Sequence, residues 1–558
     1  MKFTFGTKAA GEGCVPAACL YEPEINTRGF LTEKNRTQYP QLGISELNSG
    51  FDAVYWAKGS LSTEICEDEQ GCYVRWDGEG ELPLTFVCKI PSEGNYRVDV
   101  TLFAEKDTQA LVFLGRRRLA TRLFLRAGET VSRSFVTNIC PIIPRTFEQP
   151  MEDRTLDVTV VGAGVHLCEI NTESWQGPTL YIAGDSTVTD QSADYPYLPG
   201  SSYCGWGQML SAYLGEHMAV SNHSHSGLTT ESFRSEGHYE IMYERVRAGD
   251  LCLIQFGHND QKLMHLLAEG GYRENLIRYI KELRGKQAIP VLVTPLARNS
   301  WRGGDGAYND LLEDYARVCH EVGEEKGVPV LDLHEKSMDF VKTQGREAAK
   351  RFFFPSDYTH SNDYGAYLFA GYIYEELCEK GVFTQAGIDL TEGKKPDAWM
   401  PPAVLPVLTV PQEFAHMENP ADEHLFEDLE RPDKVLTRAG ALELIITAMH
   451  FFPTNVYNDM FTDVIGHETY AGTVECAWQN GLISETLIEQ HTLQPLKEVD
   501  GGTFVHMLLN GYATRKDLPE GADDLEMAKK LGIVTDAFDV HTVMTRGEAA
   551  AMCRKLKI

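Results

Sequence analysis

The chain has 558 residues, and 81 acidic side chains against 51 basic ones give a formal net charge of −30. A composition of 43% hydrophobic, 24% charged and 10% aromatic residues is that of a globular protein, which excludes a disordered, collagenous or low-complexity chain. The length predicts three or four domains of roughly 150 residues each. The acidic excess argues against a nucleic-acid partner or an anionic membrane surface, because both require a basic face.

Signals for export and membrane insertion are weak. Met1 to Cys14 lacks the apolar stretch of roughly 7–15 residues that a secretory signal needs, and no apolar run approaches the ~18 residues that span a bilayer. The 13 cysteines are odd in number and include no CxxC pair, which is typical of thiols in a reducing compartment. We therefore expect a cytoplasmic protein, with export to the cell wall as the alternative.

Residues 1–174 have the pattern of an all-β sandwich. Apolar and polar residues alternate from Tyr96 to Leu102, and turn residues separate further short apolar strands. Those strands are predicted at 111–114, 157–161 and 166–170. The basic run Arg116-Arg117-Arg118 is interpreted as a solvated turn of this sandwich. We expect the sandwich to brace a neighbouring domain, with sugar binding as the alternative.

Residues 175–388 alternate short buried strands with helices. This alternation predicts an α/β domain in which a mostly parallel, flavodoxin-like sheet is covered on both faces. The strands are predicted at 179–183, 251–256, 289–294 and 328–333, and the clearest helices at 273–285 and 307–326. In such folds the chemistry gathers at the carboxyl ends of the strands.

The remainder of the chain divides into two further segments. Residues 389–430 are rich in proline and then acidic, which predicts a linker. Residues 431–558 are mostly helical and partly repetitive. Their repeat length is near 54 residues, so two copies and a fragment fit.

The first polar loop of the α/β domain directly follows its first strand and reads Gly184-Asp185-Ser186-Thr187. A serine on a tight turn between strand and helix exposes its hydroxyl, and the helix start offers backbone N–H groups to an oxyanion. The alternative is that Asp185 or Ser186 caps the next helix.

Three more loops fall at the same edge of the predicted sheet. Ser221 to Gly227 ends in a glycine that lets the backbone approach a ligand, and Asn259 offers a neutral side-chain donor after another strand. Each of these loops would otherwise be an ordinary turn. Asp357 precedes His360 by three residues, a spacing that lets the carboxylate reach one imidazole nitrogen and leaves the other for a serine hydroxyl.

Together these loops resemble the SGNH hydrolase superfamily, and within it the rhamnogalacturonan acetylesterase-like carbohydrate esterases. The resemblance covers about residues 175–385. It is carried by the segments AGDSTVTDQ (183–191), GWGQ (205–208), IQFGHND (254–260), VTPLAR (293–298) and Asp357-x-x-His360.

The resemblance implies a role for each residue of these loops. Ser186 would be the nucleophile, His360 the general base and Asp357 the carboxylate that orients it. The oxyanion donors would be the backbone N–H groups of Ser186 and Gly227 and the side-chain amide of Asn259. Four further residues are assigned to substrate binding: Trp206, His258, Arg298 and Trp301. The alternative for the two tryptophans is a position in the core or in the cleft wall.

Four histidines lie near this site in the sequence: His223, His225, His238 and His258. His-x-His is a zinc spacing, but the esterase chemistry needs no metal and no carboxylate partner is evident. We therefore predict neither a metal nor another cofactor.

The C-terminal repeats resemble degenerate S-layer homology modules, on the residues Thr437-Arg438, 461–464, 481–483 and Thr545-Arg546-x-Glu548. The first copy departs from that pattern at Gly440. The resemblance implies binding of cell-wall polysaccharide by residues 431–558. The departures from the pattern favour the alternative, in which these repeats pack against another domain or mediate self-association.

The loops predict a serine esterase, and the resemblance implies that it removes O-acetyl groups from plant cell-wall oligosaccharides of the rhamnogalacturonan or pectin type. The alternative substrates are acetylated xylan and other glycans. The alternative of another class is a wall-associated carbohydrate-binding protein with a vestigial esterase site.

Overall fold

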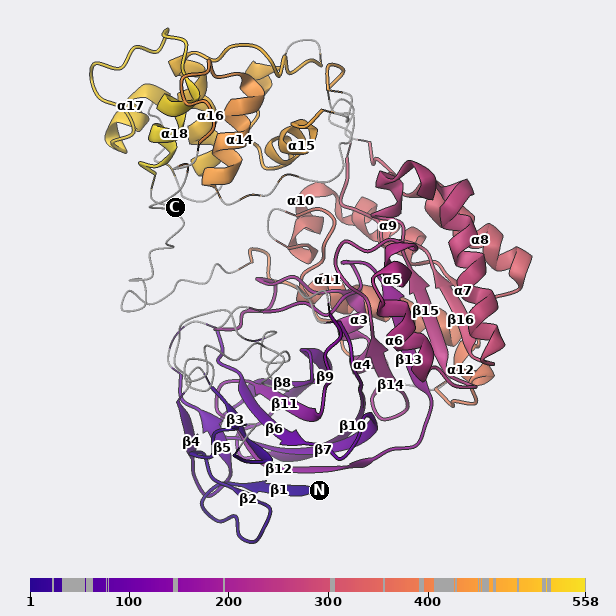
Figure 1. Ribbon diagram of the computed structural model, residues 1–558. Helices are drawn as coiled ribbons and strands as arrows, with labels where there is room; N and C mark the ends of the chain where they lie inside the picture. Colours follow the sequence, from indigo (N-terminus) through magenta and orange to yellow (C-terminus); the bar gives the residue numbers. More distant parts are fainter. Residues whose placement is uncertain are drawn as a thin grey trace. The chain divides into compact units, whose positions relative to one another are not determined.

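Figure 1 shows the computed structural model of the chain, coloured along the sequence. The structure describes all residues except 23–24, 33–55, 57–63, 77, 79, 144–148, 194–195, 302–306, 355–356, 391–395, 406–425, 427–428, 450, 452, 454–460, 465–467, 489–490, 514–517, 519–522 and 557–558. The chain forms two compact units, Met1–Asn299 with Asp310–Phe414, and Ser300–Asn309 with Ala415–Ile558. In the described residues no helix has both the length and the apolar character to cross a bilayer. Most of the predicted linker, 389–430, lies outside the described residues.

The N-terminal part of the first unit consists of two mainly antiparallel sheets (Figure 1). One sheet has the order β10 (Thr130–Ile139), β7 (Gly94–Ala104), β12 (Val165–Ser174), β1 (Lys2–Phe5) and β2 (Cys14–Val15), with β5 (Cys72–Val74) beside β12 and β4 (Ile65–Glu67) beside β5. The other has the order β3 (Arg28–Leu31), β6 (Leu84–Lys89), β11 (Thr155–Val161), β8 (Thr108–Leu114) and β9 (Arg118–Leu125).

The core between these sheets follows from the alternation seen in the sequence. Along β7, Tyr96, Val98 and Val100 are buried and the residues between them are only half-buried. Phe3 of one sheet packs against Phe86 of the other at 5.0 Å between ring centroids, so one apolar core is shared by both sheets.

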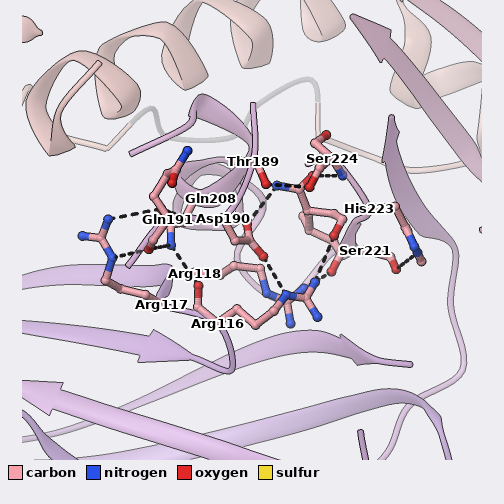
Figure 2. Close-up of polar contacts among 12 residues, drawn as sticks. Arg116, Arg117, Arg118, Thr189, Asp190, Gln191, Gln208, Ser221, His223 and Ser224 are labelled. Carbon is pink, nitrogen blue, oxygen red and sulfur yellow. Dashed lines mark hydrogen bonds and ion pairs between the residues drawn. The ribbon is translucent and has the colours of Figure 1, made fainter. Parts of the chain in front are cut away.

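The turn between β8 and β9 corrects a prediction. Arg116, Arg117 and Arg118 do not form a solvated turn, because their exposed fractions are 3%, 0% and 3%. They extend from the hairpin into the α/β part of the same unit and form ion pairs and hydrogen bonds there (Figure 2). Three adjacent arginines normally indicate a solvent-exposed segment. These three are buried only because distant segments of the chain supply partners for them.

The α/β part has a five-stranded parallel sheet. Its order is β14 (Ala219–Asn222), β13 (Thr179–Gly184), β15 (Leu251–Gln255), β16 (Ile289–Val293) and β17 (Val330–Leu331). β17 is shorter than the predicted strand 328–333. β14 was not predicted as a strand, because its four residues, Ala-Val-Ser-Asn, are too few to show a pattern.

Helices cover both faces of this sheet (Figure 1). Their bounds are α3 (Trp206–Met209), α4 (Ser211–Leu214), α5 (Ser232–Ser235), α6 (His238–Arg245), α7 (Arg273–Gly285), α8 (Glu313–Lys326), α9 (Leu333–Gln344), α10 (Arg346–Ala349), α11 (Asp363–Glu379) and α12 (Val382–Gln385). Apolar residues of α6, α7 and α8 share a core with alternate residues of β13 and β15, such as Tyr181 and Ile254. α7 begins and ends where it was predicted, whereas α8 begins six residues after the predicted start at 307.

The second unit contains α14 (Arg438–Ala448), α15 (Ala471–Gln479), α16 (Gly501–Ala513), α17 (Asp524–Lys530) and α18 (Arg546–Cys553) around its own apolar core. The segments before α14, α16 and α18 pair with one another through backbone hydrogen bonds. Leu436 N donates to Met544 O at 2.8 Å, Met544 N to Val499 O at 2.9 Å, and Val499 N to Leu436 O at 3.0 Å. The described part of this unit therefore has three equivalent helix starts, where the sequence indicated two copies and a fragment.

Candidate active site

Ser186, His360 and Asp357 form a continuous chain of hydrogen bonds. The Oγ atom of Ser186 lies 2.7 Å from Nε2 of His360, and Nδ1 of His360 lies 2.8 Å from Oδ2 of Asp357. The side chains of His360 and Asp357 are 26% and 21% exposed, so solvent reaches the pair. A hydroxyl, an imidazole and a carboxylate in this order can move a proton off the hydroxyl.

The serine is held by the turn after β13. Oδ1 of Asp185 accepts hydrogen bonds from the backbone N–H of Thr187 at 2.9 Å and from its hydroxyl at 2.8 Å. The backbone N–H groups of Val188 and Thr189 close a single turn on Asp185 O. The expected helix does not continue from this turn, since α3 begins only at Trp206. Asp185 therefore stabilises the serine turn rather than capping a helix.

The histidine is held by its own carboxylate partner. Oδ1 of Asp357 accepts the backbone N–H groups of Thr359 and His360 at 2.7 and 2.9 Å, and Oδ2 faces the imidazole. Burial raises the pKa of Asp357, but the nearby His360 and these hydrogen bonds outweigh burial and lower the pKa to about 2. Asp357 is therefore ionised throughout the neutral range and fixes Nδ1 of His360 as the protonated nitrogen.

Three groups that could face an oxyanion lie at the same edge of the sheet. Ser186, Gly227 and Asn259 follow β13, β14 and β15, which are neighbouring strands. Among the described residues, the backbone N–H groups of Ser186 and Gly227 have no hydrogen-bond acceptor. Gly227 has φ +85°, a conformation that L side chains avoid.

The amide of Asn259 is held from both sides. Its Nδ2 atom donates to Leu228 O at 3.0 Å, and its Oδ1 atom accepts from Nζ of Lys262 at 2.8 Å. Partial desolvation of the ammonium group by its neighbours and the charge of Arg298 lower the pKa of Lys262 to about 8. The ammonium group polarises the amide, which makes Nδ2 a stronger donor. No sequence pattern indicates this contact, because a lysine three residues after an asparagine belongs to no motif.

Two of the residues assigned to substrate binding are corrected by the structure. Trp206 is fully buried, and its indole N–H donates to Oε1 of Gln255 at 2.7 Å, so it cannot stack on a sugar. His258 is 2% exposed and lies between Oδ2 of Asp185 at 3.3 Å and Leu296 O at 2.9 Å. Both are interior residues, since a buried polar side chain is normally satisfied within the protein.

The other two assigned residues remain predictions. Arg298 is 8% exposed and donates to the hydroxyl of Thr359, which directly precedes His360. Trp301 lies in the segment Ser300–Asn309 and packs edge-on against Tyr308 at 5.6 Å.

Tyr203 is a site residue that sequence reasoning missed. Its ring lies edge-on to the imidazole of His360 at 5.7 Å between centroids, and its hydroxyl donates to Oδ2 of Asp357 at 3.4 Å. The ring also stacks on Phe354 at 3.7 Å. Tyr203 therefore limits the ways in which the histidine can rotate.

The four histidines near the site each contact another side chain, and His258 lies beside Asp185. His223 is buried and lies 3.0 Å from the hydroxyl of Ser221, and His225 and His238 pack ring against ring at 4.9 Å. In the part of the chain that the structure describes, no group of three or more His, Cys, Asp or Glu side chains could hold a metal ion.

Comparison with known proteins places this site in a family. Residues 182–367 match the sequence profile of the GDSL-like lipase/acylhydrolase family. The chain is 32% identical over 221 residues to the probable rhamnogalacturonan acetylesterase YesY of Bacillus subtilis, a match that covers 38% of this chain and 95% of YesY. The chain belongs to the GDSL-like lipase/acylhydrolase family. It is an ester hydrolase.

Two further matches cover a similar or larger share of this chain. Rhamnogalacturonan acetylesterase RhgT of Bacillus subtilis is 31% identical over 229 residues, which cover 39% of this chain and 96% of RhgT. The crystal structure of the Bacillus subtilis protein YxiM aligns with 68% of this chain and 98% of its own, at 22% identity and a TM-score of 0.36. The residues of the family match, 182–367, include both Ser186 and His360.

Proposed function

We propose that this protein is a serine esterase that removes O-acetyl groups from carbohydrates, with acetylated rhamnogalacturonan fragments as the substrate. The hydrogen-bonded chain of Ser186, His360 and Asp357 carries the proposal. The names of the two acetylesterases that match most of their own length support the acetyl group and the pectic sugar. Small fragments fit better than long polygalacturonate, because a net charge of −30 repels a polyanion at low salt.

The geometry supports a two-step mechanism. His360 accepts the Ser186 proton at Nε2 while Oγ attacks the carbonyl carbon of the acetyl group. The resulting oxyanion is stabilised by the N–H groups of Ser186 and Gly227 and the amide of Asn259, and one such donor is typically worth about 10²–10³ in rate. The bond to the sugar oxygen then breaks, and that oxygen takes the proton from His360.

The second step returns the enzyme to its starting state. His360 takes a proton from a water molecule, which attacks the acetyl carbonyl of the acyl-enzyme. The bond to Oγ breaks, acetate leaves, and Ser186 regains its proton from His360. Asp357 stays ionised and stabilises the imidazolium in both steps.

Acetate release tests the proposal. The native protein should hydrolyse p-nitrophenyl acetate and acetylated rhamnogalacturonan fragments, and Ser186→Ala should reduce kcat by about 10⁴-fold or more. Equal activity of the alanine variant would show that Ser186 is not the nucleophile. Faster release from acetylated xylan or mannan than from rhamnogalacturonan would replace the pectic substrate, and no release from any ester would favour a carbohydrate-binding protein.

We also propose that the enzyme acts in the cytoplasm on imported oligosaccharides. All thirteen cysteines are free thiols, including buried ones such as Cys204 and Cys252. Oxidising compartments select for paired cysteines, so this set is suited to a reducing one. Fractionation of cells that make the protein tests this, and esterase activity in the wall fraction would contradict it.

A further inference from the structure

The buried arginines of the β8–β9 turn are charges that the proposed reaction does not use. Arg116, Arg117 and Arg118 lie in the sandwich, yet each guanidinium is directed at the α/β part (Figure 2). Burial of an arginine without a partner is strongly unfavourable, so each must be compensated where it points. Arg118 donates to Val220 O in β14, and also to the sandwich residues Thr137 and Asn138 at 3.1 and 3.0 Å.

Arg117 binds three segments of the α/β part at once. Nη1 donates to Oδ1 of Asp363 at 2.6 Å, Nε donates to Gln191 O at 3.0 Å, and Nη2 donates to Tyr203 O at 2.6 Å. Arg117 and Asp363 are both fully buried. A guanidinium has five N–H groups in a fixed plane, which suits it to fix several acceptors relative to one another.

Each of those segments reaches the catalytic chain by one further contact. The side-chain amide of Gln191 donates to Ser186 O at 3.3 Å. Tyr203 lies edge-on to His360 and donates to Asp357. The third partner, Asp363, is the first residue of α11 and follows His360 by three residues in the chain.

Arg116 contacts both the serine loop and the start of the loop that leads to Gly227. Its Nε atom donates to Oδ2 of Asp190 at 2.9 Å and its Nη2 atom to Asn222 O at 3.0 Å. Oδ1 of Asp190 accepts from Nδ2 of Asn222 at 2.8 Å. Asn222 ends β14 and begins the loop that leads to Gly227, so Arg116 links the serine loop to the proposed oxyanion loop.

The backbone shows that this arrangement is held under strain. Arg117 has φ +56°, in the left-handed region that is unfavourable for a non-glycine residue. Glycine would adopt this conformation without strain, but it has no guanidinium. The strain at Arg117 is offset by its hydrogen bonds with the α/β part.

We propose that Arg117, assisted by Arg116, is a positioning residue for the esterase reaction. The sandwich turn fixes the loops of Ser186 and Gly227 and the segment of His360 relative to one another, so the sandwich is part of the catalytic apparatus rather than a brace. The proposal rests on the proposed serine-esterase function. A misplacement of about 1 Å at a reacting group costs on the order of 10²-fold in rate.

Variants at Arg117 test this in the full chain. Arg117→Lys keeps the charge but not the fork, and Arg117→Ala leaves space for a free guanidinium ion. We expect both to lower kcat on p-nitrophenyl acetate by on the order of 10²-fold, with KM changed less than about threefold. Guanidinium chloride at millimolar concentration should restore part of kcat in the alanine variant and none in Arg117→Lys.

Folding and catalysis are separated by two controls. kcat is expressed per folded molecule, with the folded fraction taken from circular dichroism at the assay temperature. Arg117→Met combined with Asp363→Asn removes both members of the ion pair and leaves no buried charge unpaired, so it should recover the native Tm but not kcat. Arg126→Ala, at an exposed arginine that follows β9, should change neither.

The outcomes distinguish the two proposals. If the native enzyme is active and the Arg117 variants have native kcat per folded molecule, the arginine serves stability alone and the positioning proposal is wrong. The same conclusion follows if the double variant regains both Tm and kcat, or if guanidinium restores only folding. If the native protein releases no acetate, the esterase function itself is wrong.

Discussion

The structure contains two carboxylate–histidine pairs beside the same serine turn, and they differ in what surrounds them. Asp357 and His360 lie 2.8 Å apart and are 21% and 26% exposed, whereas Asp185 and His258 lie 3.3 Å apart and are 0% and 3% exposed. The second nitrogen of His360 faces the Ser186 hydroxyl, and that of His258 faces the carbonyl of Leu296. Burial lowers the pKa of His258 although Asp185 raises it.

A carboxylate–histidine pair alone does not make a general base. A histidine can accept a proton from a substrate or nucleophile only if its second nitrogen is free of a protein carbonyl and reachable from solvent. His360 meets both conditions and His258 meets neither. Replacing the members of each pair should therefore have opposite effects on rate and stability.

The largest effect is expected from His360→Gln. This change removes the proton acceptor of Ser186, and kcat should fall by about 10⁴–10⁶-fold. The free energy of unfolding should change little, because the side chain is partly exposed. Steady-state kinetics and thermal unfolding measure the two quantities, and a fall in kcat of less than about tenfold would mean that another group is the base.

The next largest effect is expected from Asp357→Asn. This change should lower kcat by about 10⁴-fold, because the amide no longer holds Nδ1 of His360 protonated. The native carboxyl has a pKa of about 2, below the ordinary aspartate value of about 3.9. The stability that it contributes is therefore complete above pH ~3.9 and is lost as the pH falls towards 2. Unfolding in urea from pH 6 to pH 2 should show this loss in the native enzyme and not in the variant.

His258→Gln should lower the stability of the protein more than its rate of reaction. The variant leaves buried partners unsatisfied, which costs roughly 1–3 kcal/mol of stability, while kcat per folded molecule should fall less than tenfold. His265→Gln is the matched control, because His265 is 60% exposed in its pair with Glu231 and should change neither quantity. A loss of kcat as large as that of His360→Gln would mean that the buried pair takes part in catalysis.

The smallest effect is expected from Lys262→Met, which removes the ammonium bonded to Oδ1 of Asn259. kcat should fall several-fold because Nδ2 becomes a weaker donor. Since the pKa of Lys262 is about 8, the native rate should decline as the pH rises through 8 and the ammonium loses its proton. The variant should lack this alkaline decline, and a decline of the same size in both proteins would assign it elsewhere.

Local patterns were enough for part of this molecule. Alternation predicted β7, uninterrupted apolar runs predicted β13 and β15, and the three-residue spacing of Asp357 and His360 allowed their contact. The burial of Arg117 could not be predicted, and that of Trp206 was one of two alternatives, because each depends on a partner at least 49 residues away: Gln255 for the tryptophan and Asp363 for the arginine. Tyr203 was missed for the same reason.

The three backbone hydrogen bonds that join Leu436, Val499 and Met544 form a closed ring in the second unit. Each of these segments uses one N–H to donate to one neighbour and one C=O to accept from the other, so the ring leaves no edge for a fourth member. A solenoid can lengthen by adding copies at its ends, but this arrangement cannot. A fourth copy could therefore join this ring only by breaking one of its three backbone hydrogen bonds.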